Sequence, residues 1–191
     1  MAMTTGMGGG GMGYPPMGMG GGGGAGGGGL GGPGSGEGLT SAVYSALADG
    51  KYGDAIATLT RQLQHFPKSR AALSLLGYAY YQAGDYRSAA AAYEELLRYH
   101  VEVDAYKLYY AQSLYKAGLY PEAAKACQRV DSEQHTVRLA HLQAAVKYEE
   151  DDLTGARALL ATTPKDDPDT LVNAACITFK EGKYDAARAA F

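Results

Sequence analysis

The sequence has no tryptophan, only two cysteines and no excess of basic residues. No window reaches the roughly 18 consecutive apolar residues that a membrane-spanning helix needs. A formal net charge of −3 leaves no basic stripe that could neutralise phosphates, so nucleic-acid binding is not expected. Cys127 and Cys176 lie far apart among apolar neighbours and lack metal-ligand spacing, which favours a protein from a reducing compartment.

The first 36 residues contain 20 glycines and no charged residue at all. Such a segment has too few bulky apolar groups to offset the backbone entropy lost on folding, so residues 1–38 are predicted to form a disordered Gly/Met-rich tail. The tail also lacks the basic start and continuous apolar stretch of a secretory signal. Folded structure is expected from about Leu39, and residues 39–191 have the length of one ordinary domain.

The folded part contains a repeated hexad, Gly-x-Tyr-x-x-Ala. Copies begin at Gly50, Gly84 and Gly118, 34 residues apart, then at Gly182, with a degenerate copy at Asp151. A period of about 34 residues is typical of the tetratricopeptide repeat, a helix–turn–helix unit. The predicted fold class is therefore all-α, a tetratricopeptide-repeat superhelical solenoid of antiparallel helix pairs with about four and a half units.

Each repeat can be numbered by placing the hexad glycine at position 15. The units then begin at Gly36, Arg70, Asp104, Val137 and Pro168. Position 20 is always alanine and position 8 is small in four units, so the two helices of a unit are predicted to touch at these positions. The hexad glycine is expected to end the first helix in a left-handed conformation.

The last unit stops at Phe191, within its second helix. A solenoid needs a polar capping helix because each unit buries its open face against the next one. The chain is therefore expected to be part of a longer array.

In tetratricopeptide arrays the first helix of each unit lines the concave groove through positions 5, 9, 12 and 13. Position 12 is bulky in all five units and aromatic in four of them. Tyrosine-lined grooves suit extended or proline-rich segments, which lose little entropy on binding. The predicted partner-binding residues are Tyr44, Leu47, Tyr78, Tyr81, Leu108, Gln112, Tyr115, Lys116, Tyr148 and Phe179. The alternative is that these side chains pack as core between helices.

No catalytic residue, cofactor site or metal site is predicted, and the chain is expected not to be an enzyme. The histidines lack metal-ligand spacing, and the acidic run at residues 149–152 lacks a Gly-centred calcium loop. Position 5 carries no lysine, so the carboxylate clamp of chaperone-binding arrays is not expected either.

Four segments are more specific than the hexad. They are Ser69–Tyr81 (SRAALSLLGYAYY), Tyr109–Ala123 (YYAQSLYKAGLYPEA), Arg138–Tyr148 (RLAHLQAAVKY) and Phe179–Tyr184 (FKEGKY). These segments resemble the tetratricopeptide repeat protein 30 family, also called intraflagellar transport protein 70, a subunit of intraflagellar transport complex B. The resemblance covers about residues 40–191 and identifies them with the N-terminal part of the family; the Gly/Met-rich tail has no counterpart in it.

The resemblance implies a scaffold for cilium assembly and transport, bound in a hetero-oligomer with other complex B subunits. The family's tightly wound superhelix encloses an extended, proline-rich segment of intraflagellar transport protein 52, and the family is linked indirectly to tubulin polyglutamylation. It implies a location in the cytoplasm, the cilium or flagellum and the basal body, and no cofactor. Two alternatives stay open at this point: a regulatory repeat module of a larger enzyme, and a co-chaperone.

Overall fold

A computed structural model describes Met3 and residues 36–190. The predicted tail, apart from Met3 and the first residues of α1, lies outside the described residues, as does Phe191. The α-helices are α1 Gly36–Ala48, α2 Tyr52–His65, α3 Arg70–Gln82, α4 Tyr86–Tyr99, α5 Asp104–Lys116, α6 Tyr120–Cys127, α7 Thr136–Glu149, α8 Leu153–Leu160, α9 Pro168–Lys180 and α10 Tyr184–Ala190, with a short 3₁₀ helix, η1, at Glu133–His135. Over the described residues the fold is all-α, which confirms the predicted class.

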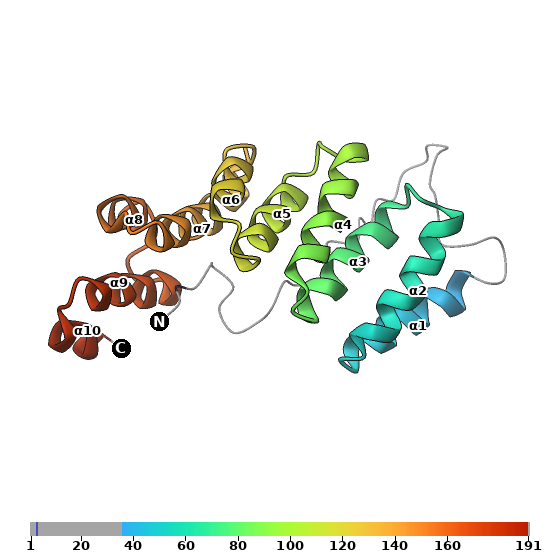
Figure 1. Ribbon diagram of the computed structural model, residues 1–191, viewed down its shortest axis with the longest axis horizontal. Helices are drawn as coiled ribbons and strands as arrows, with labels where there is room; N and C mark the ends of the chain where they lie inside the picture. The colour runs from blue at the N-terminus through green and yellow to red at the C-terminus, as the bar shows by residue number, and fades with distance from the viewer. Residues whose placement is uncertain (1–2, 4–35, 191) are drawn as a thin grey trace. The chain divides into compact units, whose positions relative to one another are not determined.

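The described residues fall into two compact units, 36–106 and 107–190, with Met3 assigned to the second. In the first unit α1 packs on α2, α2 on α3 and α3 on α4, as Figure 1 shows in blue to green. At the end of this unit the Arg70 Nε donates to the Tyr106 hydroxyl at 3.1 Å, so the first residues of α3 and α5 are joined.

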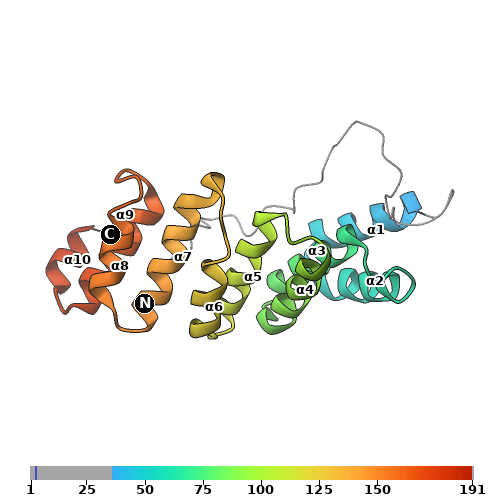
Figure 2. The same cartoon turned by 90° about the horizontal axis from the view of Figure 1, so that it is seen from above.

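In the second unit α6 packs on α7, α7 on α8, α8 on α9 and α9 on α10. The first helices of two successive repeats, α7 and α9, also contact each other directly (Figure 2). Within the described residues no helix is both long and apolar enough to cross a membrane.

The turn between the two helices of a repeat contains the first residue of the hexad. Gly50, Gly84, Gly118 and Gly182 have φ values of 70°, 81°, 76° and 80°, which confirms the predicted left-handed conformation. Asp151 takes the glycine's place in the degenerate copy and has a φ of 61°. Because a Cβ is disfavoured in this conformation, the turn of the fourth repeat is strained, whereas the glycine turns of the other repeats are relaxed.

The two helices of a unit touch through small residues, as predicted. Alanines at position 20 are at most 1% exposed in every unit. A Cβ added to Gly77, at position 8 of the second repeat, would lie 2.7 Å from the ring of Tyr93 on α4. Glycine at this site therefore lets a fully buried tyrosine fit between α3 and α4.

Candidate partner-binding groove

The ten residues predicted to bind a partner all lie on the first helices of the repeats, α1, α3, α5, α7 and α9. Their burial differs. Leu47, Leu108, Gln112, Tyr115 and Tyr148 are buried, Tyr44, Tyr78 and Tyr81 are half-buried, and Lys116 and Phe179 are exposed. Binding of a partner by these residues stays a prediction, and only some of them offer a surface to it in this structure.

In the first unit the predicted residues of α1 and α3 adjoin the hydrophobic core. Leu47 belongs to the core cluster, together with side chains such as Leu59 and Leu75. Tyr44 and Tyr78 pack against this cluster and stay half-buried. Each of these two tyrosines therefore packs on the core with one part of its side chain and is partly exposed with another.

Three of the four aromatic residues at position 12 pair with the tyrosine of the hexad five residues later. The ring centroids are 5.2 Å apart for Tyr81 and Tyr86 and 5.2 Å apart for Phe179 and Tyr184, both edge to face. Tyr115 and Tyr120 form a tilted pair at 5.7 Å. In the sequence the hexad tyrosine is recognised only as a repeat marker. Its spacing of five residues from an aromatic position 12 is the signal that could have predicted these ring pairs.

These pairs fix the orientation of the position 12 rings, because edge-to-face aromatic contacts are favourable and directional. Burial, with the nearby Tyr86, raises the pKa of Tyr81 to about 12. The Tyr81 hydroxyl therefore stays neutral at physiological pH and can donate a hydrogen bond as well as accept one.

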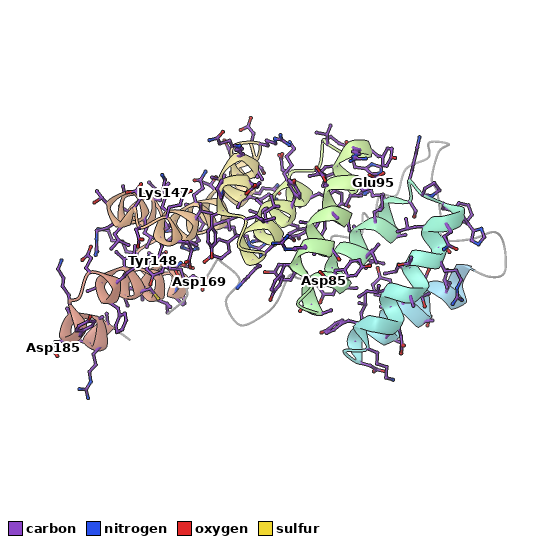
Figure 3. The ribbon with its side chains drawn as sticks, viewed as in Figure 1. Asp85, Glu95, Lys147, Tyr148, Asp169 and Asp185 are labelled. Carbon is purple, nitrogen blue, oxygen red and sulfur yellow. The ribbon has the colours of Figure 1, made fainter. Side chains whose placement is uncertain are left out.

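In the second unit position 12 of one repeat meets position 13 of the next. The Tyr115 hydroxyl donates to Glu149 Oε1 at 3.4 Å. Burial, and next the Glu149 carboxylate, raises the pKa of Tyr115. Lys180 stands in the same relation to Tyr148, with its Nζ 4.3 Å from the ring centroid (Tyr148 is labelled in Figure 3).

Comparison with known proteins agrees with this repeat geometry. The tetratricopeptide repeat family matches residues 40–86 and 75–134. Intraflagellar transport protein 70A of Xenopus laevis is 47% identical over 148 residues, which are 78% of this chain and 23% of the relative. Intraflagellar transport protein 70B of Rattus norvegicus is 41% identical over 162 residues, covering 80% of this chain and 24% of the relative.

The chain belongs to the intraflagellar transport protein 70 family. It spans about a quarter of the length of the curated relatives it matches. The resemblance inferred from the four sequence segments is thereby confirmed.

Solved structures of other proteins share the fold of this family member. MamA from Desulfovibrio magneticus RS-1 has a TM-score of 0.69 at 16% identity, covering 81% of this chain and 90% of that one. PilF from Pseudomonas aeruginosa has a TM-score of 0.63 at 18% identity, covering 81% and 72%. At such low identity the likeness shows the tetratricopeptide fold alone.

One cluster in this member of the family has the composition of a metal site. His141 on α7 and Asp167 and Asp169 at the start of α9 place ligand atoms within 4.8 Å of one another. However, His141 Nε2 already lies 2.8 Å from the Thr170 hydroxyl, which in turn donates to Asp167 Oδ2 at 3.1 Å. The cluster is accounted for by hydrogen bonds that join α7 to α9.

The electrostatics of that cluster follow from its burial. Burial lowers the pKa of His141, and the carboxylates of Asp167 and Asp169 only partly oppose this effect. The imidazole is therefore neutral at physiological pH and hydrogen-bonded inside the core.

Proposed function

We propose that the chain is part of a protein-binding scaffold for intraflagellar transport, and that its groove holds an extended, proline-rich segment of a partner subunit. Family membership supports the transport context. The observation on which the proposal rests is the series of aromatic residues on successive first helices, held in place by ring pairs in the second, third and fifth repeats.

The burial of the predicted groove residues suggests which of them contact the bound segment. The half-buried Tyr44, Tyr78 and Tyr81 present their rings to the segment, and the exposed Phe179 adds an apolar contact. Rigid aromatic side chains give large contact areas at a low entropy cost, which suits a ligand without side-chain hydrogen bonds. The buried members, such as Leu108 and Tyr148, have little surface to offer the segment.

The finer assignments come from the family resemblance. The partner we propose is another subunit of intraflagellar transport complex B, with the proline-rich segment of intraflagellar transport protein 52 as the first candidate. The proposed setting is the cilium or flagellum, its basal body and the cytoplasm. A connection with tubulin polyglutamylation would be indirect, through transport of the modifying enzymes.

The test is to co-purify the full chain with candidate complex B subunits and to map the segment that becomes protected from proteolysis. The wild-type chain should protect one extended segment rich in proline. The double variant Tyr78→Ala/Tyr81→Ala should weaken that protection while the circular dichroism signal at 222 nm keeps its helical intensity.

Tyr99→Ala is the matched control, because Tyr99 is an exposed tyrosine of α4 that was not assigned to the groove. It should leave protection unchanged. Equal loss of binding in the control and in the double variant, or no protected segment with the wild type, would contradict the proposed function.

A further inference from the structure

Gln112 is the one buried groove residue whose polar atoms are left without partners. It lies on α5 between Leu108 and Tyr115, on the same helix face, and is 1% exposed. Neither its Oε1 nor its Nε2 has a hydrogen-bond partner. Among the described residues, Gln62 and His100 each leave a single buried nitrogen unpaired, so Gln112 differs from them in having a whole amide unpaired.

The neighbouring residue shows how this part of the helix ordinarily satisfies a polar group. Ser113 is also fully buried, and its hydroxyl donates to the Tyr109 carbonyl at 2.8 Å. An unpaired amide loses its water without gaining a partner, which destabilises the folded chain, whereas an apolar side chain of similar length would not. Each unsatisfied buried polar group therefore needs a specific explanation.

The amide of a glutamine matches one particular ligand group. Its oxygen accepts and its NH₂ donates, so together the two can pair with the N–H and the C=O of a single residue in an extended main chain. The two nearest residues on this face, Leu108 and Tyr115, are apolar or aromatic and carry no charge. Every polypeptide carries the N–H and C=O that the amide requires.

Resting on the proposed function, we infer that Gln112 pairs with the main chain of the bound segment at one residue and thereby sets its register. That residue cannot be proline, since proline has no N–H for the Gln112 oxygen to accept from. Few residues of a proline-rich segment carry a main-chain N–H. The need for this donor therefore limits which residue of the segment can lie at Gln112. Apolar contacts with the tyrosines would allow the segment to shift along the groove, whereas hydrogen bonds with the Gln112 amide would not.

The burial of Gln112 has a consequence for how the segment binds. Its amide is closed to solvent in the unliganded chain, so pairing must accompany a local opening of the groove at α5. The opening costs free energy, and satisfying both polar atoms offsets part of that cost.

The experiment uses the full chain and a synthetic peptide of the segment protected in the proteolysis test. Gln112→Met replaces the amide by an apolar side chain of similar length, and Gln143→Met, a half-buried glutamine of α7, is the matched control. We expect Gln112→Met to weaken peptide binding about tenfold, as measured by calorimetry, because two hydrogen bonds are lost. The urea midpoint of the free variant should equal or exceed that of the wild type, because no unpaired amide remains. Gln143→Met should bind as the wild type does.

A second measurement removes main-chain donors from the peptide. Peptides carrying one N-methyl group at each non-proline residue in turn remove one N–H at a time. One position should weaken binding to the wild type about tenfold, and the same peptide should bind Gln112→Met no worse than the unmethylated peptide does.

The outcomes separate this inference from the proposed function. If the wild type binds no segment, the proposed function fails and the role of Gln112 falls with it. If the wild type binds but Gln112→Met binds equally well, or if no single N-methyl group matters, the groove binds the segment without Gln112 and the inference alone is wrong.

Discussion

Lys180 on α9 lies over the ring of Tyr148 on α7, with its Nζ 4.3 Å from the ring centroid and 2.6 Å from the Tyr148 carbonyl oxygen. The same Nζ lies 2.6 Å from Asp151 Oδ1, in the turn that follows α7. One side chain of the fifth repeat thus contacts the ring, the helix end and the strained turn of the fourth. A lysine near a helix C-terminus also complements the helix dipole.

Lys180→Met should lower the free energy of unfolding by about 1–2 kcal/mol, because it removes a cation–π contact and a hydrogen bond to a helix end while keeping an apolar stem. Urea denaturation followed by circular dichroism measures this change. Lys183→Met is the control, since its ion pair with Glu181 is exposed, and it should change stability by less than about 0.5 kcal/mol. Equal effects of the two substitutions would show that Lys180 acts only as a surface charge.

Gly77→Ala should destabilise the first unit by about 1–3 kcal/mol, because the new methyl group would meet the Tyr93 ring at 2.7 Å. Gly53→Ala on α2 is a matched control with nothing within 4 Å of the added Cβ. This control should stabilise the chain by about 0.5–1 kcal/mol, since alanine is the better helix former. Thermal unfolding of both variants checks the opposite signs, and a stabilising Gly77→Ala would refute the close packing of α3 on α4.

Asp151→Gly should relieve the left-handed conformation of the fourth turn, where φ is 61°. The gain should be about 0.5–1 kcal/mol at 1 M salt, where the ion pair with Lys180 is screened. At low salt the gain should be smaller, because that ion pair is lost. Gly118→Ala, which introduces a Cβ at the equivalent turn of the third repeat, should be destabilising at both salt concentrations.

The stability of the chain should fall as the pH is lowered from about 7.5 to 5. The pKa of His141 in the folded chain lies below the ordinary value of 6.5, chiefly because of burial. The unfolded chain therefore binds more protons than the folded one as the pH falls through 6.5 toward the folded pKa, and acid favours unfolding.

His141→Gln keeps a side chain that can pair with Thr170 but does not titrate, so the slope of unfolding free energy against pH should be shallower than in the wild type. Urea titrations at four pH values measure the slope. His65→Gln, at an exposed histidine of α2, is the matched control. A slope for His141→Gln equal to that of the wild type would mean that other groups cause the acid sensitivity.

The repeat and its turns can be predicted from the order of residues. A left-handed residue is needed wherever a helix must reverse over a short connection, and the hexad glycine marks that residue in four turns. Alanine at position 20 is likewise readable, because two helices approach closely only where side chains are small. Both features are local, or recur at one fixed spacing, so the pattern of residues alone predicts them.

The exposure of the predicted groove residues, in contrast, depends on how the helices pack. Leu108 and Phe179 occupy groove positions in the same numbering, yet Leu108 is fully buried and Phe179 is 43% exposed. The contact of Lys180 with Tyr148 joins residues 32 apart, across a fourth repeat of 31 residues where the first two repeats have 34. Burial and such contacts depend on how neighbouring helices sit against each other. That arrangement is set by the summed packing of many side chains, which no single position in the repeat encodes.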